Sequence, residues 1–140
     1  MQLTQFTDYG LRSLMYLAIQ PDKLCNVQEI AEYYDISKNH LVKVVHRLAQ
    51  LGYITSSRGK GGGLRLAREP KTIQLGTLVM ALEPNMNLVE CFNRETNTCT
   101  IADICRLKNF LADANKAFIN SLNQRTLADA IINKTQFLKR

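Results

Sequence analysis

A run of glycines restricts the fold of this chain more than any other feature of its sequence. The stretch GKGGG at positions 59–63 separates the β-favouring residues Tyr53 to Arg58 from Leu64 to Leu66, which alternate as a strand. Glycines between two such runs predict a β-hairpin with a flexible turn. A phosphate-binding loop would open a helix instead, so a nucleotide site is rejected for this stretch.

Two helix patterns stand directly before the hairpin. Asn26, followed by Glu29, predicts a capped start for the first of them. A three-residue turn follows at positions 35–37, and its last residue, Ser37, is placed to cap the next helix, which is expected from Lys38 to Leu51. Two short helices joined by a tight turn and followed by a hairpin predict a winged helix-turn-helix.

The second helix of this motif carries a polar face that suits the reading of DNA bases. Within a motif that spans Gln28 to Leu51, the residues expected to contact DNA are Ser37, Lys38, Asn39, His40, Lys43 and Arg47. Asn pairs well with adenine and Lys with guanine in the major groove. In the hairpin, Arg58, Lys60 and Arg65 are expected to contact DNA, with Arg58 or Lys60 entering the minor groove. A simple solvated helix face is the alternative that spacing alone leaves open.

The distribution of charge favours a polyanionic partner. The net charge is +6, from 18 basic and 12 acidic residues. Eight of the basic residues and one acidic residue lie between Lys38 and Lys71, so the rest of the chain is close to neutral. Basic residues gathered on a DNA-reading motif would displace counterions from phosphate.

Composition and length set the cellular context. At 140 residues the chain is expected to form one domain, or one domain with a long helical extension. Met1 to Tyr9 lack the basic start of a signal peptide, and no apolar run approaches the ~18–20 residues of a membrane span. We therefore expect a cytoplasmic protein with no membrane partner, in which thiols stay reduced.

The remaining helices are predicted from apolar spacing. A first helix is expected from Phe6 to Ile19, a short one from Leu75 to Leu82, a long one from Arg106 to Asn123 and a last one after Thr126. The long helix has an apolar stripe but little partner surface in its own chain. Pairing with a second copy is therefore expected, although packing back on the winged domain is the alternative.

These patterns predict a mainly α-helical protein with a small β-hairpin wing. Three parts are expected: a winged helix-turn-helix DNA-binding domain at residues 1–84, a cysteine loop at 85–105, and a helical dimerisation segment at 106–140 that contains the long C-terminal helix. A homodimer of this kind would bind a pseudo-palindromic double-stranded DNA operator.

Three cysteines occupy the predicted loop, at a spacing of C-x7-C-x5-C. Cys91, Cys99 and Cys105 include no C-x-x-C pair, so a structural zinc site fits poorly. Three soft ligands suit an iron–sulfur cluster if a fourth ligand comes from elsewhere. Buried apolar cysteines are the other interpretation, and it is the one that we prefer for Cys25. A thiol oxidoreductase would need C-x-x-C or a Cys–His pair, and neither is evident.

Several stretches resemble one family of regulators over nearly the whole chain. They are MQLTQFTDYGLR at 1–12, SKNHLVK at 37–43, RGKGGGLRL at 58–66, LEP at 82–84, VEC at 89–91, CRLK at 105–108 and TLAD at 126–129. These resemble the winged-helix iron–sulfur cluster transcriptional regulators of the IscR, RirA and NsrR group. Within the group the chain is most similar to the nitric-oxide-sensing repressors of the NsrR type. IscR-like members usually have a histidine just after the third cysteine, and here Arg106 follows instead.

The resemblance implies a homodimeric repressor with an iron–sulfur cluster in each subunit, 4Fe–4S being favoured and 2Fe–2S possible. Cys91, Cys99 and Cys105 match the family's ligands. For the fourth ligand the candidates are Asp8, His40, His46 and Glu90, and we favour Asp8 from the partner subunit. Nitric oxide would be the signal, and nitrosylation or loss of the cluster would release the protein from DNA. The alternatives are an iron-responsive or cluster-biogenesis regulator and a redox regulator that uses thiols alone.

Overall fold

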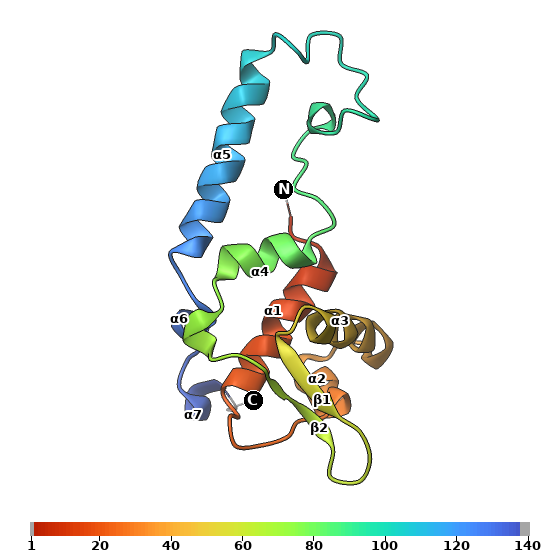
Figure 1. The fold of residues 1–140 in the computed structure, drawn as a ribbon, viewed down its shortest axis with the longest axis vertical. Helices are drawn as coiled ribbons and strands as arrows, with labels where there is room; N and C mark the ends of the chain where they lie inside the picture. Colours follow the sequence, from red (N-terminus) through yellow and green to blue (C-terminus); the bar gives the residue numbers. More distant parts are fainter. Residues whose placement is uncertain (1, 138–140) are drawn as a thin grey trace.

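A winged body and a projecting arm make up the computed structural model, which describes residues 2–137 (Figure 1). The body contains α1 (Gln5–Ala18), α2 (Val27–Tyr34), α3 (Lys38–Gln50), β1 (Ile54–Ser57), β2 (Gly63–Leu66), η1 (Pro70–Thr72), α4 (Leu75–Leu82), α6 (Leu127–Ala130) and α7 (Lys134–Phe137). The arm is α5 (Arg106–Asn123) together with the loop before it, which contains η2 (Glu90–Phe92). This order confirms the predicted mainly helical fold with a β-hairpin wing.

The helix-turn-helix forms as its sequence predicts. The Asn26 side chain accepts a hydrogen bond from the backbone N–H of Glu29 at 2.8 Å, and the Glu29 carboxylate accepts one from the N–H of Asn26, which completes a capping box at the start of α2. Asp35 ends the helix in the left-handed conformation, at φ 54°. Ser37 occupies the N-cap position of α3 but makes no capping hydrogen bond through its side chain, which departs from our prediction.

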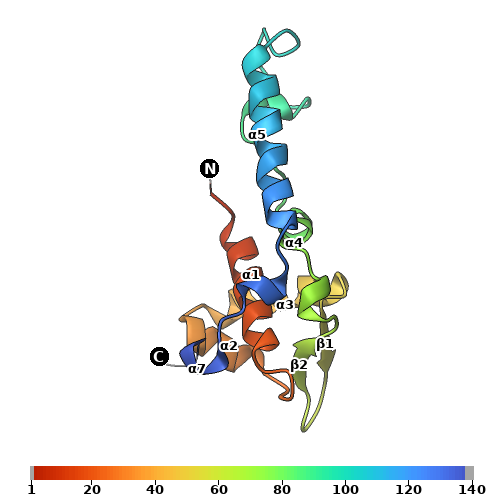
Figure 2. The same ribbon diagram turned by 90° about the vertical axis from the view of Figure 1, so that its left-hand side faces the viewer.

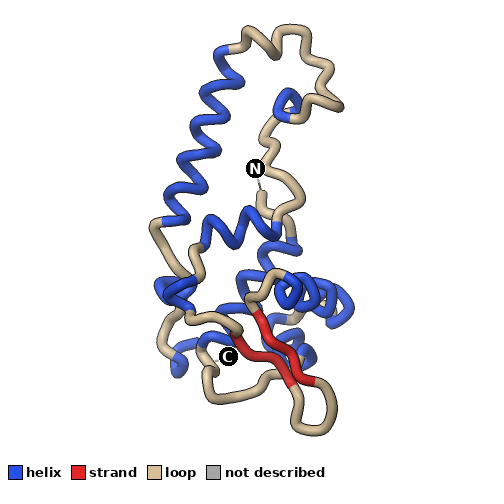
Figure 3. Tube along the Cα trace, in the orientation of Figure 1, coloured by secondary structure: helices blue, strands red, loops and turns tan. Residues whose placement is uncertain are grey.

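The wing is an antiparallel hairpin that pairs Ile54 with Leu66 and Ser57 with Gly63. A backbone bridge extends it, because Cys25 and Leu64 exchange two hydrogen bonds of 3.0 and 2.7 Å. Gly62 is required at the turn, since a Cβ there would lie 2.3 Å from the carbonyl oxygen of Ser57. Gly63, which we predicted in the turn, is the first residue of β2. Figure 3 shows the two strands at the lower edge of the body.

One hydrophobic core holds the winged body together. α1 packs on α3, α4 and β2, and α2 packs on α3. The fully or nearly fully buried side chains come from every part of the body: Leu14, Leu17, Ile30, Leu41, Val44, Leu48, Ile54, Leu64, Ile73, Leu78 and Leu127. Cys25 belongs to the same core, which confirms its interpretation as a packing residue. The core thus fixes α3 and the wing relative to each other.

The arm is continuous with the body at both ends, through the loop that follows α4 and through the C-terminal end of α5. Figures 1 and 2 show α5 standing away from the body, with the cysteine loop at its far end. No residue of this fully described helix is buried. Just after α5, the N–H of Leu75 donates to the carbonyl of Arg125 at 3.0 Å, and the N–H of Leu127 donates to the carbonyl of Ile73 at 2.8 Å. The chain therefore returns to the body through α6, where Leu127 is buried.

Other boundaries agree with the predictions or refine them. α1, α3, α4 and α5 each begin and end within one residue of the positions expected from apolar spacing. The loop is less irregular than predicted, because η2 contains Cys91. The last helix begins after Thr126 as predicted, and Thr126 and Asp129 form a capping box there. It is only four residues long, and α7 follows. Positions 138–140 of the predicted helical segment and position 1 lie outside the described residues.

Among residues 2–137 no helix combines the length and the apolar character that crossing a membrane requires.

The anchoring of the arm can be tested through stability. Leu127 has 0% of its surface exposed, so Leu127→Ala should lower the free energy of unfolding by about 2–5 kcal/mol. Ile132, five residues later in the same segment, is 50% exposed, and Ile132→Ala should change it by less than about 0.5 kcal/mol. Denaturant titration of the two cluster-free variants and the parent measures both. Equal losses for the two variants would contradict a specific anchor at Leu127.

Candidate DNA-binding surface and cysteine loop

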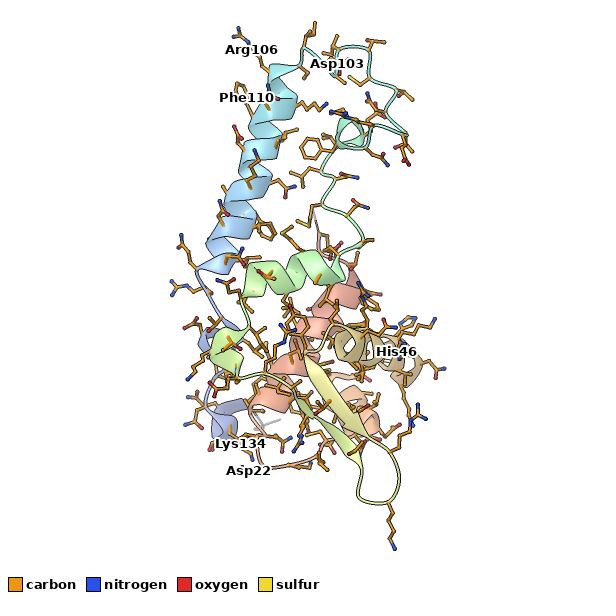
Figure 4. The ribbon with its side chains drawn as sticks, in the orientation of Figure 1. Asp22, His46, Asp103, Arg106, Phe110 and Lys134 are labelled. Atoms are coloured by element: carbon orange, nitrogen blue, oxygen red, sulfur yellow. The ribbon has the colours of Figure 1, made fainter. Side chains whose placement is uncertain are left out.

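The recognition helix α3 divides into a buried face and an exposed face. Leu41, Val44, Val45 and Leu48 are buried against the body. All six residues predicted to read DNA are exposed: Ser37, Lys38, Asn39, His40, Lys43 and Arg47. His46 lies on the same exposed face, next to Gln50 at 3.1 Å, and Figure 4 shows it pointing away from the body. The predicted contact residues therefore share one accessible surface.

Most of the basic residues in this region are free of carboxylate partners. In the part of the chain that the structure describes, no ion pair involves Lys38, Lys43, Arg47, Arg58, Lys60 or Arg65. Lys71 is paired with Glu69 at 2.9 Å. Six unpaired cations on α3 and the wing leave a positive surface that suits phosphate groups.

Arg68 bonds to the chain at the end of α3, a contact that sequence reasoning missed. Its side chain donates to the carbonyls of Leu51 and Gly52 at 3.0 Å each, and its guanidinium lies 4.6 Å from the ring centre of Tyr53. It thereby satisfies carbonyls left free at the end of α3. No local sequence pattern predicts these hydrogen bonds, because Arg68 lies 16 and 17 residues from the carbonyl groups that accept them.

The wing presents its charges along one exposed edge. Arg58 and Lys60 are exposed in the turn region, on either side of Gly59. Arg65, in β2, donates to the hydroxyl of Thr55 across the hairpin at 3.4 Å, so its head group is held over β1. Among the described residues, six cations without an ion pair lie on the wing and on α3.

The three loop cysteines are free thiols of intermediate exposure. Cys91 lies in η2, and Cys105 is the N-cap residue of α5. Between them, the backbone N–H of Cys99 donates a hydrogen bond of 3.0 Å to the side-chain oxygen of Asn97. The Cys105 sulfur accepts the backbone N–H of Lys108 at 3.4 Å. A helix N-terminus favours negative charge, so this position suits a thiolate ligand.

The loop does not gather its thiols into a site within one protomer. Among residues 2–137 no three His, Cys, Asp or Glu side chains converge as metal ligands would. The donor chemistry nevertheless suits an iron–sulfur cluster, because three unpaired soft ligands lie within fifteen residues and one of them caps a helix. A cluster would require this loop to close and a fourth ligand to approach it.

The candidate fourth ligands lie in different surroundings. Asp8 is on α1 and forms a two-point ion pair with Arg12, at 2.8 and 3.0 Å. Within the cysteine loop, the Glu90 carboxylate accepts a hydrogen bond of 3.2 Å from the hydroxyl of Thr98. His40 and His46 lie on the exposed face of α3. Figure 1 shows α1 and α3 in the body and the cysteines at the far end of the arm, so Asp8 of the same protomer does not adjoin them.

Two side-chain contacts connect the arm to α1 by way of α4. Asn123, the last residue of α5, accepts the N–H of Thr77 at 2.8 Å, within the first turn of α4. Glu83, just after α4, accepts the N–H of Thr4 at 2.7 Å and its hydroxyl at 3.1 Å. Thr4 is the N-cap of α1. Sequence reasoning missed both contacts, which join residues 46 and 79 positions apart.

The apolar stripe of α5 is present and only partly covered. Leu107 and Phe110, near the loop end of α5, are 61% and 64% exposed, and Phe110 is labelled in Figure 4. Nearer the body, Leu111 and Phe118 line a cavity of about 640 Å³ together with Leu3, Met86 and Val89. A helix whose apolar residues remain open to solvent lacks part of its partner surface.

Comparison with known proteins identifies the family. The model of the Rrf2 family, described as iron-dependent transcriptional regulators, matches residues 3–133. Relatives include the HTH-type transcriptional regulator NsrR of Shouchella clausii, which is 51% identical over 96% of this chain and 91% of its own length. The regulator NsrR of Bacillus subtilis is 46% identical over 99% of this chain and 96% of its own.

Solved structures share the fold. The global cysteine regulator CymR of B. subtilis has a TM-score of 0.74 and 25% identity, with 93% of this chain and 95% of that one covered. IscR of T. potens has the same TM-score and identity, with 93% and 85% covered. Both likenesses cover most of the two chains compared, so this chain shares their fold.

The difference between the buried thiol and the loop thiols can be measured directly. Burial, followed by the nearby Glu29 carboxylate, raises the pKa of Cys25 to about 11, so this group is neutral and inaccessible at pH 8. We expect iodoacetamide to add three labels to the native cluster-free protein, at Cys91, Cys99 and Cys105, and a fourth only after denaturation. Intact mass and peptide mapping count the labels. Labelling of native Cys25 at the rate of the loop thiols would contradict its place in the core.

Proposed function

The chain belongs to the Rrf2 family of transcriptional regulators and is not an enzyme, and from this premise we propose that it is a nitric-oxide-sensing repressor. It would bind pseudo-palindromic operators as a homodimer and leave them when its iron–sulfur cluster is nitrosylated or lost. One observation carries the proposal: the same chain has three free thiols on one loop and a winged body with six unpaired cations. The relatives named NsrR support the choice of signal.

DNA binding would use α3 and the wing. Asn39 and Lys43 would face base edges in the major groove, while Arg58, Lys60 and Arg65 would contact the backbone or minor groove. Unpaired cations displace counterions when they meet phosphate, so operator affinity would fall steeply with salt. We propose residues 1–84 for DNA binding, 85–105 for the thiols and 106–140 for pairing, although α6 and α7 within the last segment pack on the winged body.

A homodimer would cover the apolar stripe of α5. Leu107 and Phe110 are more than half exposed in the single protomer, and no α5 side chain is buried. A second copy related by a two-fold axis offers the same stripe, so the two would be mutually complementary. The same symmetry would place two α3 helices about one DNA turn apart, ~34 Å, as a palindromic site requires.

Cys91, Cys99 and Cys105 would hold the cluster, with Asp8 of the partner subunit as the proposed fourth ligand. A bound iron–sulfur cluster supplies iron atoms with which nitric oxide reacts; 4Fe–4S is favoured and 2Fe–2S remains an alternative. The Asp8–Arg12 pair is more than 40% exposed at both side chains, so exchanging Arg12 for another partner costs less than about 1 kcal/mol. A carboxylate is a harder and more exchangeable ligand than a thiolate, which leaves its iron more open.

The signal would reach DNA through α1. Asp8 lies one turn from the N-cap of α1, and α1 packs directly on α3. Ligation of Asp8 would tie α1 of one subunit to the loop of the other, and release would free the two recognition helices to change their separation. The coupling is thus a difference in binding free energy between two states of the dimer.

A second candidate function has its own support. The family description is iron-dependent regulation, so control by iron supply or by demand for clusters would use the same three thiols. A thiol-only redox regulator is the third alternative, and it would need no iron at all.

The ligand set predicts which variants lose iron. Cys91→Ser, Cys99→Ser and Cys105→Ser should each abolish cluster retention, since a weakly acidic hydroxyl does not replace a thiolate. Cys25→Ala is the control and should retain full iron and sulfide, because Cys25 is buried in the core away from the loop. Iron and sulfide analysis after anaerobic purification, with the visible spectrum, gives the result. Full content in any loop variant removes that cysteine from the ligand set.

Anaerobic titration of operator duplex tests the function itself. We expect tight binding by the cluster-loaded protein and weak binding by both the cluster-free and the nitric-oxide-treated protein. Asp8→Ala should keep the dimer but lose most of the difference between loaded and cluster-free protein. Asp113→Ala removes a more exposed carboxylate, paired with Lys116 on α5, and it should behave as the parent. Equal affinity of the parent in all three states would rule out sensing. If removal of the cluster abolishes binding but nitric oxide has no effect, the iron-responsive alternative is favoured.

A further inference from the structure

An exposed valine interrupts the polar surface of the recognition helix. Val42 is 47% exposed, whereas the other large apolar residues of α3 (Leu41, Val44, Val45 and Leu48) are at most 6% exposed. The core therefore does not account for Val42. Its side chain stands among groups that the proposed function directs at DNA.

The neighbours of Val42 on the helix surface include residues proposed to contact DNA. Lys38 and Asn39 precede it by four and three residues, and the exposed His46 follows it by four, so all three lie about one turn from it. One turn advances about 5.4 Å along the helix, which is less than two steps of about 3.4 Å along a DNA strand. A helix that brings Lys38 and Asn39 to base edges therefore brings Val42 to the same or the next base pair.

Helix stability does not explain a valine at this position. A β-branched side chain loses rotamer freedom in a helix, and alanine is the better helix former at an exposed site. The cations around Val42 also argue against an apolar protein partner, because Lys38 and Lys43 are unpaired and would have to be desolvated with it. A partner that is itself anionic but has a local apolar group fits this surface better.

The major groove contains one such group. Thymine displays its 5-methyl there, while cytosine displays an amine and no methyl, so an apolar side chain can distinguish the two. We propose that Val42 is a specificity-determining residue, which packs against the 5-methyl group of a thymine within each operator half-site. The inference rests on the proposed binding of DNA through α3 and adds to it an apolar contact between hydrogen-bonding residues.

The test uses an operator selected by the full-length cluster-loaded protein from a pool of random duplexes, under anaerobic conditions. Each thymine of the selected site is then replaced by deoxyuridine, which lacks only the 5-methyl. At one thymine per half-site we expect roughly fourfold weaker binding, equivalent to about 0.8 kcal/mol for one buried methyl. Val42→Ala should bind the thymine duplex several-fold more weakly than the parent and should no longer distinguish thymine from deoxyuridine.

Two further variants separate this contact from general damage. Val42→Thr keeps the β-branch and one γ-methyl, so it should retain part of the discrimination. Lys43→Ala should weaken binding to both duplexes while leaving their ratio close to that of the parent. Val42→Ala should also melt at the same temperature as the parent or slightly higher, since alanine suits an exposed helix position.

The outcomes divide cleanly. Discrimination that is present in the parent and lost in Val42→Ala supports the assignment. Parent protein that binds thymine and deoxyuridine equally at every position overturns it, as does discrimination that survives in Val42→Ala. Failure to select any duplex would overturn the proposed DNA binding, and this inference with it.

Discussion

The carboxylate of Glu83 ties the start of α1 to the end of α4, which also packs on α1 and α5. By accepting the N–H and the hydroxyl of Thr4, it fixes the N-cap of α1 to the end of α4. At the other end of α4, the amide oxygen of Asn123 accepts the N–H of Thr77, which fixes the arm. The short helix α4 thus has both of its ends bonded to other helices. Its apolar middle, with Leu78 and Val79 buried, adds packing to these polar contacts. This one segment therefore links the arm to α1, which itself packs directly on α3.

The protein separates its chemistry into two distant regions. Six of the cations without an ion pair lie on α3 and the wing, and the soft thiols lie at the far end of the arm. The core of the winged body is complete in one protomer, whereas the apolar stripe of α5 is only partly covered. The parts whose core is complete in one chain are therefore those proposed to read DNA. The parts that remain incomplete are those proposed to sense, which is consistent with a sensor assembled by two subunits.

Local patterns were sufficient to predict the helices, the wing and the cysteine loop. The Asn26 box, the glycines around Lys60 and the stripe of α5 each act through neighbours within a few residues, and all formed as expected. Contacts between distant residues could not be predicted. Nothing near Glu83 indicates Thr4, and nothing near Arg68 indicates the carbonyl of Leu51, because each partner is chosen by the packing of helices. Ser37 occupies the predicted N-cap position of α3, but its side chain makes no capping hydrogen bond.

The close approach of α5 to α4 at Gly76 makes the arm a lever with its fulcrum at one end. A Cβ on Gly76 would lie 2.6 Å from the carbonyl of Ile119, so the two helices touch at that point. The 18 residues of α5 extend about 27 Å at 1.5 Å per residue. A shift of about 1 Å among the thiols would therefore reach the fulcrum as a rotation of only about 2°. A displacement at the thiols thus becomes a smaller displacement near Gly76, so within one subunit the arm would transmit little of a movement of the cysteine loop. A bond made directly to α1 of the other subunit would avoid that loss.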